Sequence, residues 1–191
     1  MPISSALSGT YEWTVRAARD VGYEKVHVYD GKCTTFMLEM LVKEAVKLRE
    51  RPVEEVISAL DDLRSRMRLY AALDTLEYLK RGGRISKAAS MVGGMLKIKP
   101  VITVTEDGKI RLIHKSIGMN AALRYISELY SSDKKDANYA VRTIYCMDDS
   151  NCLKLRGLVG ETPLPPENIC PIIGTHIGPS AAGIVYVVEK V

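Results

Sequence analysis

The sequence predicts an α/β protein in two parts, a parallel-sheet α/β unit over residues 1–68 and an α+β domain over residues 69–191. Up to about residue 70, segments of strand and helix periodicity alternate, which favours a parallel unit. Beyond that point, a strong hairpin signal stands among helical segments, which is typical of an α+β domain with a largely antiparallel sheet. At 191 residues, the chain is long enough to build a sizeable core.

The first part begins with an apolar residue, a polar turn and an amphipathic segment, which predicts a strand end followed by a helix from about Thr10. Apolar and polar residues then alternate over 25–30, as in a half-buried strand. Two apolar stripes at helical spacing follow, the second of which opens at Pro52. The predicted elements are a strand over 25–30, helices over 34–49 and 52–63, and a strand over 68–73.

The second part mixes short helices with strands. Its clearest signal is a pair of β-rich runs separated by Glu-Asp-Gly, which predicts a hairpin. The predicted helices cover residues 74–80, 86–96, 121–130 and 153–158. The predicted strands cover residues 99–105, 109–114, 139–146, 168–173 and 183–188.

Composition and charge exclude several classes of protein. Hydrophobic residues make up 47% and charged residues 26% of the chain, which excludes a disordered protein. No apolar stretch approaches the roughly 20 residues that span a bilayer, and no signal peptide opens the chain. A cytoplasmic protein without stable membrane insertion is therefore expected. The net charge of +4 suits an anionic ligand without requiring nucleic acid.

The four cysteines, Cys33, Cys146, Cys152 and Cys170, are scattered and form no CxxC motif. The spacing between Cys146 and Cys152 fits no usual zinc site, and the three histidines are far apart in sequence. We therefore expect free buried thiols in a reducing compartment, and neither a metal nor a cofactor.

The first candidate site is the run ISSALSGT over residues 3–10, which places four hydroxyl side chains before a helix. Hydroxyl groups and free backbone N–H groups at a helix start can bind an anionic oxygen. Serine and threonine are also preferred helix caps, so Ser8 or Thr10 could simply accept the free N–H groups of the first helical turn and bind no ligand. Both interpretations remain open at this point.

The second candidate site is LKRGGRI over residues 79–85. Paired glycines allow close approach of the backbone, and the flanking Arg81 and Arg84 offer planar donors for a carboxylate or phosphate. The alternative is a glycine that ends a helix, with the two arginines in solvent.

The third candidate is His176 in IGTHIGPSAAG, residues 173–183, which we expect to be a glycine-rich loop between two strands. A neutral or protonated imidazole there could donate to an anion. The alternative is a histidine that bonds only to the loop backbone. His27 and His114 are expected to be structural.

The motifs of known catalytic machinery are absent: the sequence has no GxSxG elbow, P-loop or GxGxxG. A serine/histidine hydrolase or phosphotransfer enzyme that uses Ser5 or Ser8 with His176 is the alternative function. A further alternative is a nucleic-acid-binding module that uses four basic side chains, and salt-sensitive binding of DNA or RNA would reveal it. These cations are Lys80, Arg81, Arg84 and Lys87.

In their order and spacing along the whole chain, these segments resemble the DegV family, the bacterial fatty-acid-binding proteins that serve as the FakB subunit of fatty acid kinase. The resemblance rests on five stretches: 3–11 (ISSALSGTY), 74–86 (DTLEYLKRGGRIS), 96–100 (LKIKP), Asp107-Gly108 and 173–183 (IGTHIGPSAAG).

The resemblance implies a DegV-like two-domain fold that binds one long-chain fatty acid. It places Ser8, Ser5 and His176 at the fatty acid carboxylate, with Ser4 less favoured. Arg84, and more weakly Arg81, would face the phosphate and the kinase. The chain would be a lipid-binding subunit without catalytic machinery, in phospholipid metabolism. It would present the carboxylate to an ATP-dependent, FakA-like kinase, with at most transient membrane contact.

The chain departs from the family pattern at its start. Family members carry roughly 80–90 residues before the SSxxSGT turn, including the first strands of the sheet. The resemblance therefore implies that residues 1–68 are the C-terminal part of the first DegV domain and residues 69–191 the second domain. We expect the partial parallel sheet to leave an open edge with exposed apolar surface.

Overall fold

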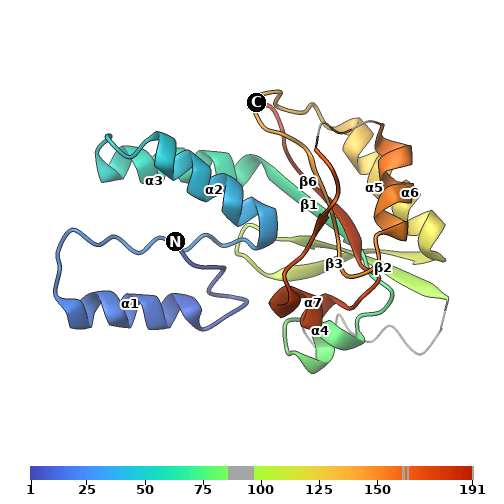
Figure 1. Ribbon diagram of the computed structural model, residues 1–191, viewed down its shortest axis with the longest axis horizontal. Coiled ribbons are helices and arrows are strands. Elements are labelled where there is room, and N and C mark those ends of the chain that lie inside the picture. Colours follow the sequence, from blue (N-terminus) through green and yellow to red (C-terminus); the bar gives the residue numbers. More distant parts are fainter. Residues whose placement is uncertain (86–96, 161, 163, 191) are drawn as a thin grey trace. The chain divides into compact units, whose positions relative to one another are not determined.

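The computed structural model describes residues 1–85, 97–160, 162 and 164–190, which form two compact units (Figure 1). The first unit combines residues 1–67 with residues 105–109, and the second contains the other described residues. The helix predicted over 86–96, and with it Lys87, lies outside the described residues. The α/β fold class with a largely antiparallel sheet is confirmed.

The first unit contains three helices: α1 (Thr10–Val21), α2 (Thr35–Lys47) and α3 (Val53–Arg66). Helix α1 ends where Gly22 adopts a left-handed conformation and donates its N–H to the Arg19 carbonyl. Helices α2 and α3 contact each other, and their apolar stripes supply five buried side chains. These side chains are Met37, Met40, Leu41, Leu60 and Leu63.

The strand predicted over residues 25–30 is wrong, because this segment has irregular backbone. Alternating side chains provide one face of a strand, but a strand also needs a neighbour that accepts and donates its backbone hydrogen bonds. No such neighbour pairs with this segment among the described residues. The parallel pairing expected within residues 1–68 is likewise absent from this fully described unit.

The second unit is built on a six-stranded sheet with the order β3-β2-β1-β6-β4-β5. Strand β1 pairs with β2, β2 with β3, and β4 with β6, all antiparallel, whereas β4 and β5 are parallel. The predicted hairpin is confirmed as β2–β3. The strands are β1 (Met67–Ala72), β2 (Ile98–Val104), β3 (Ile110–Ile117), β4 (Arg142–Tyr145), β5 (Glu167–Asn168) and β6 (Ala182–Val187).

In the described part of this unit, four helices accompany the sheet: α4 (Glu77–Arg81), α5 (Met119–Ser132), α6 (Ser150–Val159) and α7 (Pro171–Ile177). The strand predicted over 168–173 is only two residues long, because Pro171 opens α7. Proline at a first helical position has its φ angle set for the helix and lacks an N–H that would otherwise be unpaired.

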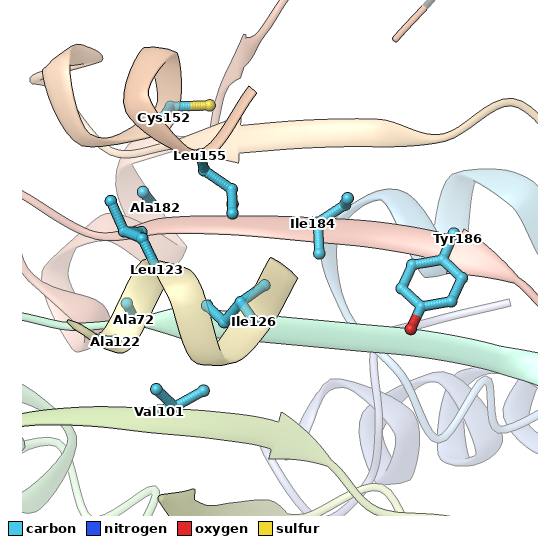
Figure 2. Close-up of a cluster of buried hydrophobic side chains, with 10 residues drawn as sticks. All are labelled: Ala72, Val101, Ala122, Leu123, Ile126, Cys152, Leu155, Ala182, Ile184 and Tyr186. Atoms are coloured by element: carbon cyan, nitrogen blue, oxygen red, sulfur yellow. The ribbon is translucent and has the colours of Figure 1, made fainter. Parts of the chain in front are cut away.

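Helices α5 and α6 pack on each other and on the sheet, and the core of this unit lies beneath them (Figure 2). Figure 2 shows α5 and α6 contributing Leu123, Ile126 and Leu155 to this core. The phenol of Tyr186 on β6 is fully buried and donates to Asp133 Oδ2 at 2.7 Å. The hydroxyl of this buried tyrosine therefore has a partner.

Candidate functional site

The run of hydroxyl residues 4–10, here called the hydroxyl turn, is held in the first unit by Ser4. This residue is fully buried and donates its N–H to the Cys33 carbonyl at 3.0 Å and its hydroxyl to the Gly108 carbonyl at 2.9 Å. Its own carbonyl accepts the N–H groups of Leu7 and Ser8. Ser4 is therefore an anchor of the turn, with its hydroxyl already in use.

Ser5 is exposed, and both of its donors are directed at one carboxylate. Its hydroxyl donates to Asp30 Oδ2 at 2.6 Å and its N–H to Asp30 Oδ1 at 3.1 Å, while the Lys32 N–H also donates to Oδ1 at 3.0 Å. Burial alone would raise the pKa of Asp30, but these hydrogen bonds outweigh it and lower the pKa below its ordinary value. Asp30 is therefore an anion at neutral pH, seated on the donors of Ser5.

Ser8 is half-buried at the start of α1. Its Oγ accepts the Thr10 N–H at 3.2 Å and lies 2.8 Å from Thr10 Oγ1. The N-cap residue of α1 is Gly9, which makes no side-chain cap bond, so Ser8 bonds the first helical N–H from one position outside the helix. These bonds leave one use of the Ser8 hydroxyl open. If Thr10 donates the hydroxyl–hydroxyl bond, the Ser8 proton is available to an anion.

Two threonines at the start of α2 also lie in this unit and were missed as candidates. Thr34 is the N-cap residue and Thr35 the first helical residue, and both hydroxyl oxygens are buried without a partner among the described residues. Thr35 also adopts a φ of 52°, which is unusual for a β-branched residue. Two hydroxyl residues before an apolar stripe were the available sequence signal.

In the second unit, the glycine pair has two distinct roles. Gly83 has a φ of 69° and ends α4: its N–H donates to the Lys80 carbonyl, and the Arg84 N–H donates to the Leu79 carbonyl. These two bonds form a Schellman motif, so the helix-ending interpretation of this glycine is correct. Gly82 has an ordinary φ of −72° and is needed for a different reason.

The reason is His176, whose ring lies against the Gly82 backbone. A Cβ at residue 82 would lie 2.2 Å from His176 Nδ1 and 2.8 Å from its Cε1. Helices α4 and α7 contact each other here, and Tyr78 of α4 packs in the same way on Gly178 beyond α7. His176 sits in the last turn of α7, so the prediction that it lies in a loop is wrong. Pro171 starts this helix and Gly178, at a φ of 87°, follows it.

The imidazole of His176 belongs to a cluster with Gly82 and Arg84, here called the histidine–arginine cluster. Its Nδ1 is buried with no partner among the described residues. Burial, and then the positive charge of Arg84, lower the pKa of His176. Arg84 donates from Nη1 to the Gly82 carbonyl. His176 is therefore neutral at pH 7 and has one ring N–H to donate.

Arg81 differs from Arg84 in its surroundings. Its side chain is 76% exposed, and its Nε lies 2.8 Å from Glu77 Oε1 one turn earlier on α4. An exposed pair of this kind contributes little to stability and leaves the guanidinium at the surface. Arg84 is thus the arginine that the fold brings to His176.

The structure divides the predicted site residues between the two units. Ser5 and Ser8 lie in the first unit, and His176, Arg84 and Arg81 lie in the second. The hydroxyls of Ser5 and Ser8 bond to Asp30 and Thr10, which gives no support to a serine activated by a histidine. Within the described ranges, no three of the metal-ligating residue types come together, and no helix is long and apolar enough to cross a bilayer.

Sequence reasoning missed Asp30 and the contact at Gly82. Asp30 was assigned to the end of a strand, and nothing in its neighbourhood indicated that it bonds to Ser5, 25 residues away. The glycine pair was recognised as a place of close approach, but the ring that approaches lies 94 positions along the chain. Both features depend on tertiary contacts.

The family model described as an uncharacterised protein of the DegV family matches residues 1–189 of the chain. A DegV domain-containing protein of Caldanaerobacter subterraneus is 33% identical over 192 residues, covering 96% of this chain and 68% of that protein. Another from Clostridium acetobutylicum is 34% identical over 200 residues, covering 98% of this chain and 69% of that protein.

Solved structures give the same assignment. A fatty-acid-binding DegV family protein from Thermus thermophilus has a TM-score of 0.79 at 28% identity, covering 98% of this chain and 69% of that one. A Eubacterium eligens DegV protein loaded with heptadecanoic acid has a TM-score of 0.82 at 22% identity, covering 98% and 71%. The Streptococcus pneumoniae fatty acid kinase B3 protein, loaded with linoleic acid, has a TM-score of 0.77 at 22% identity, covering 98% and 70%. The chain belongs to the DegV family.

Proposed function

We propose that this protein is a carrier that binds one long-chain fatty acid and presents its carboxylate to an ATP-dependent fatty acid kinase for acyl-phosphate formation. The observation that carries the proposal is the Thermus thermophilus relative, a DegV protein that binds fatty acid and is 28% identical to this chain. In this scheme the chain holds and orients the ligand, and the kinase supplies the phosphoryl chemistry.

The energetics of a fatty acid suit a carrier. Burying about 14 methylene groups at roughly 0.8 kcal/mol each gives a gross drive of about 11 kcal/mol. Ordering the acyl chain and losing its free motion remove several kcal/mol of this. The remainder permits micromolar or tighter binding, so the polar contacts to the carboxylate set its orientation more than its affinity.

For the carboxylate we propose Ser8, Ser5 and His176 as donors, with Ser8 the principal hydroxyl. Asp30 supports this order, because its carboxylate already occupies the hydroxyl and N–H of Ser5. A second carboxylate at Ser5 would have to displace Asp30 against like-charge repulsion. Ser8 accepts an N–H from Thr10, and its hydroxyl proton can turn to a ligand when Thr10 donates the hydroxyl–hydroxyl bond.

For the phosphate and the kinase we propose Arg84 and, more weakly, Arg81. A guanidinium provides planar paired donors that match phosphate oxygens. Arg84 lies in the histidine–arginine cluster, where its charge acts on His176, while Arg81 is exposed beside Glu77. Arg84 would therefore act at the head group, and Arg81 would contribute to the surface that meets the kinase.

Two variants separate holding the ligand from presenting it. Ser8→Ala should weaken fatty acid binding about tenfold, since one hydrogen bond to a carboxylate contributes about 1.5 kcal/mol. Thr10→Val, which changes the same helix start but leaves the Ser8 hydroxyl, should keep its fatty acid affinity within about twofold of the unaltered protein.

Arg84→Ala should slow acyl-phosphate formation by a purified fatty acid kinase, whereas Lys80→Ala, which removes a neighbouring exposed charge, should not. Unchanged binding in Ser8→Ala and unchanged turnover in Arg84→Ala would refute these assignments.

Fatty acid binding should become tighter as the pH falls from 8 to 6. Burial and Arg84 keep the pKa of His176 below its ordinary value of about 6.5, so the free protein has a neutral imidazole at pH 7. A bound carboxylate favours the imidazolium and raises this pKa, so binding takes up protons. The stability of the ligand-free protein has the opposite pH dependence. The pKa of His176 is lower in the folded protein than in the unfolded chain, so lowering the pH through 6.5 decreases the free energy of unfolding.

Calorimetric titration with palmitate in two buffers of different ionisation enthalpy measures this proton uptake. His176→Asn should abolish it, while His27 and His114 remain in both proteins as internal controls. The same proton uptake in His176→Asn and in the unaltered protein would rule out His176 as the group that titrates.

A further inference from the structure

Two cysteines lie where β4 ends and α7 begins. Cys146 directly follows β4, and Cys170 is the residue that precedes Pro171 and caps α7. The parallel pairing of β4 and β5 places Tyr145 opposite Asn168, and the Ile169 N–H donates to the Tyr145 carbonyl at 2.8 Å. The two cysteines therefore stand one and two residues beyond a paired position on adjacent strands.

Gly174 lies one turn beyond Cys170 and directly beside the Cys146 sulfur. Its N–H donates to the Cys170 carbonyl at 3.0 Å, so Cys170 and Gly174 are one helical turn apart. Cys170 caps the helix with an extended backbone, and residues one turn apart lie over the same side of a helix. The Cys146 Sγ lies 2.8 Å from the position that a Cβ on Gly174 would occupy. Because residue 174 has no side chain, the Cys146 sulfur can lie against α7 one turn from the point where Cys170 caps it.

The exposure of the two thiols differs. Cys170 is exposed, which corrects the expectation that all four thiols are buried, whereas Cys146 is only 4% exposed. Burial, and then the proximity of Cys170, raise the pKa of Cys146. A small oxidant therefore reaches Cys170 first, and Cys146 is the thiol beside it that can react next.

We propose that Cys170 and Cys146 form a peroxide-responsive thiol pair that closes into a disulfide at the start of α7. The Cys170 thiolate attacks one peroxide oxygen, the O–O bond breaks, and a sulfenic acid forms. The departing hydroxide takes up the proton that the thiol released on ionising and becomes water. The Cys146 sulfur then attacks the Cys170 sulfur, the S–O bond breaks, and the hydroxyl leaves as water with the thiol proton. Two thiols and one hydrogen peroxide thus give one disulfide and two waters.

The disulfide would join the end of β4 to the first turn of α7. His176 lies two residues beyond Gly174 on this short helix, so a change in the path of α7 reaches the imidazole that packs on Gly82. The inference stands on the thiol geometry and is independent of the proposed ligand. Its test therefore needs no fatty acid.

The test treats the full chain with hydrogen peroxide, blocks residual thiols, and maps the unreduced peptides by mass spectrometry. We expect a cross-linked peptide pair containing Cys146 and Cys170, with a loss of about 2 Da that is restored by dithiothreitol. Cys152→Ser, which removes a buried thiol on α6, should retain the cross-link. In Cys146→Ser, dimedone should trap the sulfenic acid on Cys170.

Three results would overturn the proposal. One is a Cys170 that proceeds to sulfinic acid while Cys146 remains a free thiol. Another is a disulfide that joins two copies of the chain through Cys170, seen as a dimer in non-reducing electrophoresis. The third is recovery of both thiols unmodified under peroxide concentrations that oxidise a surface cysteine in a reference protein.

Discussion

Gly183→Ala is expected to destabilise the second unit by about 3 kcal/mol or more, at the upper end of what added volume costs in a packed interior. Strand β6 lies between β1 and β4, so it is held on both sides. A Cβ at residue 183 would lie 2.6 Å from the Tyr70 carbonyl oxygen and 3.0 Å from the Ala71 Cβ. These are backbone and near-backbone atoms of β1, which cannot rotate away as a long side chain could.

The clash cannot be relieved without opening the sheet. Neighbouring strands are about 4.8 Å apart, and a shift of β6 away from β1 would press it on β4. Glycine is therefore required at this position for close approach of two strands. Tyr186 on the same strand is part of the buried core, so a displacement of β6 also disturbs the packing shown in Figure 2.

Urea unfolding followed by circular dichroism measures this effect, with Gly157→Ala as the matched control. Gly157 lies inside α6, and apart from its own helix backbone no described residue has an atom within 4 Å of the position of an added methyl group. Alanine there should therefore stabilise the helix by about 0.5–1 kcal/mol. An unfolding midpoint of Gly183→Ala equal to that of the unaltered protein would contradict the close approach of β6 to β1.

Gly82→Ala is expected to remove His176 from its position and to weaken ligand binding as much as His176→Asn does. The φ of −72° at Gly82 suits alanine, so the backbone itself is not strained by the change. The added methyl would lie 2.2 Å from His176 Nδ1, and the ring must rotate away. The expected loss is about tenfold in fatty acid affinity, equal to one charge-assisted hydrogen bond.

Gly83→Ala separates this steric effect from strain at the end of α4. Gly83 has a φ of 69° but open space around it, so alanine there costs about 1 kcal/mol in backbone conformation and leaves the ring in place. The double variant Gly82→Ala/His176→Asn should bind no more weakly than either single variant, because both changes remove the same interaction. Additive losses would show that Gly82 acts through something other than His176. NMR titration of the His176 ring in each variant reports its position directly.

The sequence predicted the elements that are specified by local pattern. Helices α2 and α3 follow from apolar stripes at helical spacing, and the β2–β3 hairpin follows from two β-rich runs around a glycine turn. The strand predicted over residues 25–30 was wrong because the alternation of apolar and polar side chains does not show whether a neighbouring strand is there to pair with it. Helix α7 was missed because residues 168–173 were predicted as a strand and the following residues as a loop, although proline at residue 171 also starts a helix.

The candidate site was predicted in its residue types and only partly in its contacts. The hydroxyl turn, Arg84 and His176 could be found from the sequence because each lies in a distinctive short motif. Their partners could not be found in this way: Asp30 reaches Ser5 across 25 residues, and Gly82 receives a ring from α7. Long-range contacts of this kind depend on how the elements pack, which local spacing does not specify.

Native mass spectrometry of the purified protein, followed by denaturation and lipid extraction, tests the central claim most directly. The carrier function predicts a complex of one protein with one fatty acid, with a mass increment that matches a C14–C18 acid in the extract. Ser8→Ala should retain less of this lipid than Thr10→Val. A protein that is recovered without lipid and shows no mass increment after incubation with palmitate or oleate would contradict fatty acid binding by this chain.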